Sequence, residues 1–372
     1  MKYIFSFLKI TTISIAIIYI TAINDFSNLY FVLRCALLGI LIVELGSLFR
    51  SIFKNEGTND TIKNTSLSVF SLAILLAFLE LVFTFVPHSH GADQTYGARL
   101  WKKKYWYPIN QYGFRDNELP KNDSTIFFIG DSFTAGYGIN HVENRFSNIV
   151  STELNRQNSV FKIINLGVCG HDTKDEFDTM NRFIAESNIK PKKIVLQYFS
   201  NDIDKTAFKN GLTYPEFEPY KEFPHAVRAL FKGSFLLNYV YWILPHSVPE
   251  SYMDFLKKAY TNEAIYGKHL EDLTNFVQYT QENNIELCVL VLPVFQAVKE
   301  SKTVYTEKII EYFKKKGVKT IDVAQLCEDL TVKQMIVNAN DGHASVLVNQ
   351  RIGQAVLKIL MQKDMLLGIN KN

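Results

Sequence analysis

The sequence predicts a three-layer α/β/α domain with a parallel sheet, preceded by a region of transmembrane helices. Two observations predict this architecture. The apolar residues before Pro87 gather in three long stretches, each close to the roughly 20 residues that a membrane-spanning helix needs. After residue 124, short β-rich apolar runs alternate with amphipathic stretches of helical period, which is typical of a parallel sheet covered by helices on both faces.

The three amino-terminal stretches are residues 3–23, 29–49 and 67–86. Positively charged residues prefer the cytoplasmic side of a membrane. Lys2 and Lys9 mark the start of the chain, and the second link, 50–64, carries three positive residues, whereas the first link carries none. Because no small-residue cleavage motif follows the first stretch, residues 1–87 are expected to form an uncleaved three-helix anchor. The rest of the chain is then extracytoplasmic, with a bacterial inner membrane as the expected location.

Three ionisable residues, Arg34, Glu44 and Glu80, interrupt the second and third stretches. Such groups are costly inside a membrane and often functional. A structural role is favoured here. Either Arg34 and Glu44 extend toward the ends of their helix, or Arg34 pairs with Glu80 across helices.

The remaining chain divides into a linker, 88–123, and a globular domain, 124–372. Its predicted strands are 125–129, 160–166, 193–199, 285–292 and 318–323. Its predicted helices are 143–156, 174–187, 263–282, 304–316 and 346–361. Strands that are apolar throughout indicate a sheet buried on both faces.

An aromatic-rich segment, 204–261, breaks this alternation because it contains no clear strand. A structureless loop of that length is improbable in a compact domain, so part of it is expected to be helical, notably 225–244. Three roles are open for the segment: a lid over an active site, an interfacial helix touching the bilayer, or additional core. Additional core is the preferred interpretation.

Composition excludes several classes of function. The net charge of +3, with no basic tract, does not suggest a nucleic-acid partner. The four cysteines lack CxxC spacing, so neither a metal site nor a disulfide framework is expected. His88 and His90 lack a third ligand and are interpreted as part of the linker. Cys169 is expected to be a small buried residue and not a nucleophile.

Chemistry-bearing residues follow the predicted strands. Gly130-Asp131-Ser132 ends the strand 125–129, and ligands bind at the carboxyl ends of strands in open α/β sheets. Ser132 is therefore a candidate nucleophile. Alone, this tripeptide is a weak signal, because a serine at that place often caps a helix.

Further strand ends strengthen the signal. Gly170 follows the second strand, Asn201-Asp202 follows the third, and Asp341-Gly342-His343 follows the last. Together with Ser132 they supply a nucleophile, two kinds of oxyanion donor, and a histidine beside a carboxylate. This set of groups is typical of acyl transfer.

These four blocks, in this order, resemble the SGNH or GDSL-type hydrolases, and the lead-in 110–116 resembles that of membrane-anchored bacterial members. The resemblance covers about 110–360 and implies a flavodoxin-like α/β/α domain without a cofactor. It also implies that Ser132 is the nucleophile and His343 the base. The oxyanion hole would consist of the Ser132 and Gly170 N–H groups and the Asn201 side chain.

The sequence departs from the family pattern at two places. Phe199 stands where the third block commonly has glycine, and Asp341 lies two residues before His343 instead of three, a place that Asn340 occupies. In an extended segment, residues two apart point to the same side. Asp341 is therefore the expected partner of His343, with Asn340 as the alternative.

The leading hypothesis is a membrane-anchored serine esterase that hydrolyses acyl esters, most plausibly O-acetyl esters, on envelope glycans or lipids. Its partners would be that acylated substrate and the lipid bilayer. One alternative is an O-acyltransferase component that passes the acyl group to a cell-surface polysaccharide. Another is a non-catalytic glycan-binding or scaffold protein, in which the displaced Asp leaves the histidine idle.

Overall fold

The structure is a computed structural model that describes residues 2–23, 28–54, 59–86, 94–118, 124–215, 217–244, 246 and 250–366. The predicted boundary at Pro87 and the linker histidines His88 and His90 lie outside these ranges. The chain forms two compact units. One consists of Met1–Tyr105 and Glu218–His246, and the other of Trp106–Phe217 and Ser247–Asn372.

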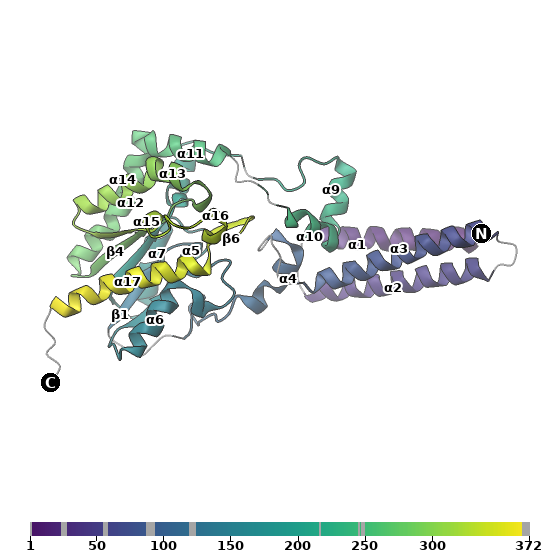
Figure 1. Cartoon of the computed structure of the whole chain (residues 1–372), viewed down its shortest axis with the longest axis horizontal. Helices are drawn as coiled ribbons and strands as arrows, with labels where there is room; N and C mark the ends of the chain where they lie inside the picture. The colour runs from purple at the N-terminus through teal and green to yellow at the C-terminus, as the bar shows by residue number, and fades with distance from the viewer. Residues whose placement is uncertain are drawn as a thin grey trace. The chain divides into compact units, whose positions relative to one another are not determined.

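The first unit contains three long helices, α1 (Lys2–Ala22), α2 (Asn28–Phe53) and α3 (Asp60–Thr84), which run side by side (Figure 1). All three are long and apolar enough to cross a membrane, as predicted. Helix α3 begins before its predicted stretch because the Asn59 side chain caps it, accepting hydrogen bonds from the Thr61 and Ile62 N–H groups at 2.6 and 3.3 Å.

Three shorter helices complete this unit: α4 (Tyr96–Tyr105), α9 (His225–Lys232) and α10 (Phe235–Ile243). The helical structure predicted over 225–244 is present, but it is divided into two helices, α9 and α10. Gly233 ends the first. Ser234 caps the second, its hydroxyl accepting a hydrogen bond from the Leu237 N–H at 3.0 Å. A small aromatic core packs residues 220–242 together. It is formed by Tyr220, Phe223, Phe231, Tyr241 and Trp242.

The second unit is built on a five-stranded parallel sheet of order β2-β1-β3-β4-β5. Its strands are β1 (Thr125–Ile129), β2 (Lys162–Asn165), β3 (Pro191–Tyr198), β4 (Glu286–Val291) and β5 (Lys319–Asp322). Each lies within or beside a predicted strand. Strand β1 pairs with β2 on one side and with the central strand β3 on the other, with Phe127 opposite Ile164 and Ile194.

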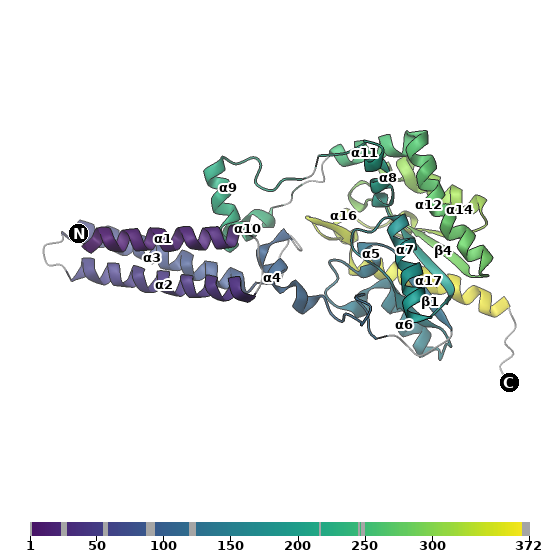
Figure 2. The same ribbon diagram turned by 180° about the vertical axis from the view of Figure 1, so that it is seen from behind.

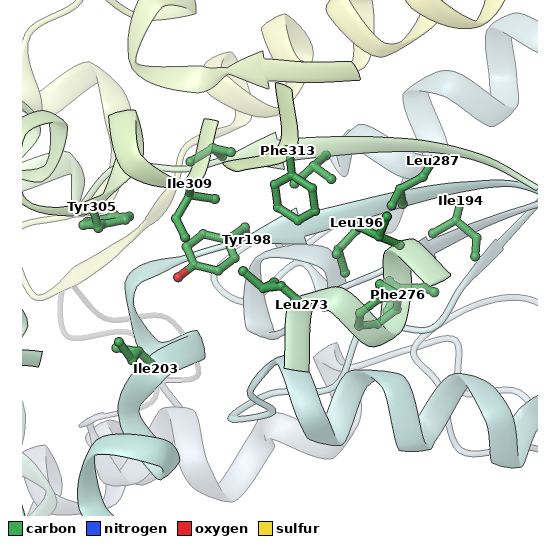
Figure 3. Close-up of a cluster of buried hydrophobic side chains, with 14 of the residues drawn as sticks. Ile194, Leu196, Tyr198, Ile203, Leu273, Phe276, Leu287, Tyr305, Ile309 and Phe313 are labelled. Atoms are coloured by element: carbon green, nitrogen blue, oxygen red, sulfur yellow. The ribbon is translucent and has the colours of Figure 1, made fainter. Parts of the chain in front are cut away.

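Helices cover both faces of this sheet, which confirms the predicted three-layer α/β/α fold (Figures 1 and 2). One face packs against α7 (Thr173–Ser187), α12 (Glu263–Glu282) and α14 (Glu307–Lys315), and Figure 3 shows this core, including Leu196, Phe276 and Phe313. The other face packs against α6 (Phe146–Arg156) and α17 (Val346–Leu366). Shorter helices are α5 (Ser132–Ala135), α8 (Asp204–Lys209), α11 (Glu250–Thr261), α13 (Val298–Ser301), α15 (Val323–Leu326) and α16 (Val332–Met335).

A two-stranded antiparallel hairpin, not predicted from the sequence, follows the main sheet. It consists of β6 (Ile336–Asn338) and β7 (Asp341–Ala344), with Ile336 opposite Ala344. Both of these apolar residues are buried in the core that includes α17. The hairpin therefore fixes an extended backbone at Asp341 and His343.

Candidate active site

The turn after β1 presents Ser132 as the first residue of α5. Asp131 caps this helix, its Oδ1 accepting a hydrogen bond from the Phe133 N–H at 2.9 Å. The turn is tight at Gly130, where a Cβ atom would lie 2.2 Å from Thr134 Oγ1 and 2.4 Å from Gln197 Oε1. Only glycine fits there without displacing these groups, so the local sequence fixes where the Ser132 hydroxyl lies.

A continuous hydrogen-bonded chain joins Ser132, His343 and Asp341. His343 Nε2 is 2.7 Å from Ser132 Oγ, and His343 Nδ1 is 2.5 Å from Asp341 Oδ1. With Asp341 ionised, Nδ1–H donates to the carboxylate, and Nε2 is left to accept from the serine hydroxyl. This arrangement is that of a nucleophile with a general base oriented by a buried carboxylate.

The hairpin explains why Asp341 reaches the imidazole from two residues away. In β7, residues 341 and 343 face the same side, as expected for extended backbone. The predicted alternative, Asn340, donates its backbone N–H to Asn338 Oδ1 at 2.9 Å, inside the turn of the hairpin. The structure thus brings Asp341 to His343.

The two other predicted oxyanion donors lie in the turns after β2 and β3. Gly170 has a φ of +79°, a conformation that favours glycine, and a Cβ there would meet open space. Asn201 lies in the short 3₁₀ turn Ser200–Ile203, and its Nδ2 donates to Asp131 Oδ2 at 2.9 Å. A carboxamide nitrogen carries two donors, and this bond uses one of them.

Phe199, which stands where the family pattern has glycine, occupies an ordinary extended backbone with φ −135°. Its N–H donates to Asp202 Oδ2 at 2.7 Å, and its ring packs against Phe133 at a centroid distance of 4.5 Å. The position therefore needs no glycine, and the side chain fills space beside the turn that carries Ser132.

Cys169, which the sequence predicted to be buried, is exposed, and that prediction is wrong. The residue lies in the turn after β2, next to Gly170, which is also exposed. Its exposure makes it a suitable control for the assignment of the nucleophile.

Three carboxyl groups, Asp131, Glu176 and Asp202, are buried beneath the site, and sequence analysis did not identify this cluster. Burial raises the pKa of each, and the neighbouring carboxyls raise the pKa of Glu176 and Asp202 further. Glu176 is only 2% exposed, and neither of its oxygens has a hydrogen-bond partner among the described residues. Burial and the neighbouring carboxyls therefore favour the neutral form of Glu176 in the folded protein.

We expect Glu176→Gln to stabilise the protein more at pH 8 than at pH 5. A carboxyl with a raised folded-state pKa destabilises the fold as pH rises above its unfolded-state pKa of about 4.3. A neutral amide removes that penalty, so the Tm of the variant relative to wild type should be higher by a few degrees at pH 8 than at pH 5. Thermal unfolding at both pH values measures the effect, with Glu186→Gln on the exposed face of α7 as control. Equal pH dependence of wild type and Glu176→Gln would contradict the assignment.

Aromatic rings cover both sides of the His343 imidazole. The ring centroids of Phe133 and Tyr137 each lie 4.7 Å from that of His343. The turn that carries Tyr137 is held by buried Arg115, whose guanidinium donates to the Gly136 and Ile139 carbonyls, each at 2.6 Å. The lead-in 110–116 thus braces the catalytic turn.

We expect Arg115→Lys to lower kcat about tenfold with little change in KM for a small ester. Lysine lacks the planar fork that binds two carbonyls at once, so the Tyr137 turn and the imidazole beside it lose their fixed position. Steady-state kinetics on an aryl ester measure the effect. Arg182→Lys, on the exposed side of α7, is the control. An unchanged kcat in the folded variant would show that Arg115 does not brace the site.

The chain was compared with known proteins. Residues 126–233 match the family model described as GDSL-like lipase/acylhydrolase, whereas no curated protein matches. Among solved structures, a lipolytic protein of the G-D-S-L family from Desulfitobacterium hafniense DCB-2 is 14% identical, with a TM-score of 0.39, covering 63% of this chain and 98% of its own. The psychrotrophic esterase EstA from Pseudoalteromonas sp. is 14% identical, with a TM-score of 0.38, covering 64% and 98%.

Proposed function

From the premise that this chain belongs to the GDSL/SGNH family of serine ester hydrolases, we propose that it is a membrane-anchored esterase working through an acyl-Ser132 intermediate. The observation that carries this proposal is the hydrogen-bonded chain from Ser132 through His343 to Asp341. The non-catalytic alternative depended on a displaced Asp that leaves the histidine idle. The 2.5 Å bond between Asp341 and His343 argues against it.

The proposed reaction has two halves. In the first, His343 Nε2 takes the Ser132 proton as Oγ attacks the ester carbonyl carbon, and then delivers that proton to the leaving alcohol. In the second, water attacks the acyl-enzyme with the same histidine as base, releasing the acid and restoring Ser132. Asp341 holds the imidazole in its tautomer and stabilises the imidazolium in both halves.

The developing oxyanion is assigned to three donors: the N–H groups of Ser132 and Gly170 and the Asn201 amide. The Gly170 N–H is proposed as a donor because Gly170 has a left-handed backbone conformation with open space at its Cβ position. A ligand can therefore approach the backbone closely there. Asn201 supports this assignment because Asp131, the neighbour of Ser132, holds the amide in place while leaving one N–H.

The location proposed for this chemistry is the extracytoplasmic face of a bacterial inner membrane. Three spanning-length helices and the positive residues at 2, 9 and 50–64 support an amino terminus in the cytoplasm. Reporters fused after Asn372 test the orientation: activity of a reporter that works only outside the cytoplasm supports it. Activity of only a cytoplasmic reporter would reverse the assignment.

The substrates proposed are O-acetyl esters of envelope glycans or lipids. The purified full-length protein, incubated with an O-acetylated polysaccharide, is expected to release acetate, with Ser132→Ala as the inactive control. Adding a de-acetylated glycan distinguishes hydrolysis from transfer. Acetate as the sole product supports the esterase, whereas acetylated acceptor would favour the acyltransferase alternative.

A further inference from the structure

The buried charges of the first unit have identified partners. Arg34 of α2 forms an ion pair with Glu80 of α3 at 2.6 Å, as one of the sequence interpretations expected. Arg34 Nε also donates to Thr21 Oγ1 of α1 at 3.1 Å. Arg34 therefore joins all three long helices and is not a group extended toward the end of α2.

Glu80 has a second set of partners, at the start of α10. Its carboxylate accepts hydrogen bonds from the Phe235 and Leu236 N–H groups at 3.0 and 3.2 Å and from the Ser234 hydroxyl. The first N–H groups of a helix have no partner within the helix, so a carboxylate there satisfies them. The Arg34 guanidinium lies 4.1 Å from the centre of the Phe235 ring. Together, these contacts fasten α10 to the ion pair.

Helix α10 lies at one end of the group of three long helices (Figure 2). Glu80 precedes the end of α3 at Thr84 by about one helical turn, or roughly 6 Å. Ile18 of α1 lies a similar distance from Ala22, and a Cβ at Gly233 would come 2.5 Å from its Cγ2. The junction of α9 and α10 thus lies level with the last turn of α1 and α3.

The same segment exposes apolar side chains at this level. The exposed apolar side chains are Leu230 of α9, Val240 and Ile243 of α10, and Leu244, which follows α10. Phe78, Val82 and Phe85, at the end of α3, are also exposed. Both the spanning-length helix α3 and the segment 230–244 that packs on it therefore expose apolar side chains. Tyr239, whose ring lies 4.6 Å from that of Phe83, is of a residue type enriched where membranes meet water.

We propose that residues 218–246 are an interfacial segment whose exposed apolar side chains lie against lipid in the extracytoplasmic leaflet. This inference rests on the proposed membrane anchor. It assigns the bilayer as the partner of Leu230, Val240, Ile243 and Leu244. It also gives the Arg34–Glu80 pair a role, which is to hold α10 at the level of the lipid surface.

Depth-dependent quenching tests this proposal in the full-length protein reconstituted into phosphatidylcholine and phosphatidylglycerol bilayers. Single cysteines carrying a bimane are placed at Leu244, which is 62% exposed, at Phe78 of α3, which is 54% exposed, and at Val332 of the second unit, which is 42% exposed. The background is Cys35→Ser with Cys169→Ser, because these two thiols are partly or fully exposed, whereas Cys288 and Cys327 are buried. Lipids with a nitroxide high on the acyl chain and aqueous iodide are the two quenchers.

We expect the nitroxide lipid to quench the probes at 244 and 78 at least threefold more than the probe at 332, and iodide to show the reverse order. Lipid quenching at 78 but not at 244 would overturn the interfacial assignment while leaving the anchor intact. No lipid quenching at either place would overturn the anchor itself. Shielding of the probe at 244 from both quenchers would identify a protein surface, such as a second copy, as the occupant and would also overturn the proposal.

Discussion

Replacing Ser132 by Ala is expected to lower kcat for a short-chain aryl ester by at least about 10³-fold, because the variant cannot form the acyl-enzyme. The residual rate reflects binding and the oxyanion donors alone. The variant should keep its fold, since the Ser132 hydroxyl contacts His343 at a half-buried position and no core residue depends on it. Turnover and labelling by a fluorophosphonate serine probe both measure the effect.

The matched control for this experiment is Cys169→Ala. Cys169 directly precedes Gly170 and is exposed. A thiol at this place could be mistaken for the nucleophile. We expect Cys169→Ala to keep kcat within about threefold of wild type, the range typical of a substitution outside the reacting groups. Undiminished turnover in Ser132→Ala, together with a loss in Cys169→Ala, would reverse the assignment.

The second large effect is expected from Asp341→Asn. Asp341 is buried and accepts a hydrogen bond from His343 Nδ1, so an amide in its place presents the wrong partner and favours the wrong imidazole tautomer. The same Asp-to-Asn change in the serine-protease triad lowers kcat by about 10⁴, and a loss of at least about 10² is expected here. KM should change little, because the carboxylate does not touch the substrate.

Asn340→Ala is the comparison for this variant, since Asn340 holds the place that the family pattern gives to Asp. We expect it to lower kcat less than about fivefold, because His343 Nδ1 is bonded to Asp341 and the Asn340 backbone N–H keeps its bond to Asn338. A larger loss in Asn340→Ala than in Asp341→Asn would make Asn340 the orienting residue. The pH dependence of kcat/KM, recorded for both variants, reports whether the histidine still acts as base.

The fold was largely predictable because each strand of the main sheet is a short, continuous run of apolar residues. Nothing polar interrupts Ile126 to Ile129 or Val289 to Val291, so burial on both faces is visible in the sequence. The hairpin of β6 and β7 was not predictable in the same way. Its strands are three and four residues long, and the second contains Asp341, Gly342 and His343, which carry no strand signal.

The proposed catalytic side chains were easier to locate in the sequence than the groups packed around them. Ser132 and His343 could be identified from the sequence because a serine and a histidine that follow predicted strands are typical of acyl transfer. Glu176 is a charged residue on the buried face of α7, in line with Met180 and Phe183, and a rule that places charges outward misses it. Arg115 lies in the lead-in 110–116 that the sequence singled out, but its hydrogen bonds to the Gly136 and Ile139 carbonyls carry no sequence signal, because every sequence supplies backbone carbonyls.

The division of the chain into units has a consequence for release of the second unit from the three long helices. The polypeptide passes from the first unit to the second after Tyr105, returns at Glu218, and passes back after His246. A single proteolytic cut near residue 105 would therefore leave the second unit attached through α9 and α10, which remain bound to α1 and α3 through Gly233 and Glu80. Shedding a free hydrolase requires removal of the whole returning segment, and a protein shortened to begin at Trp106 would carry α9 and α10 without the helices on which they rest.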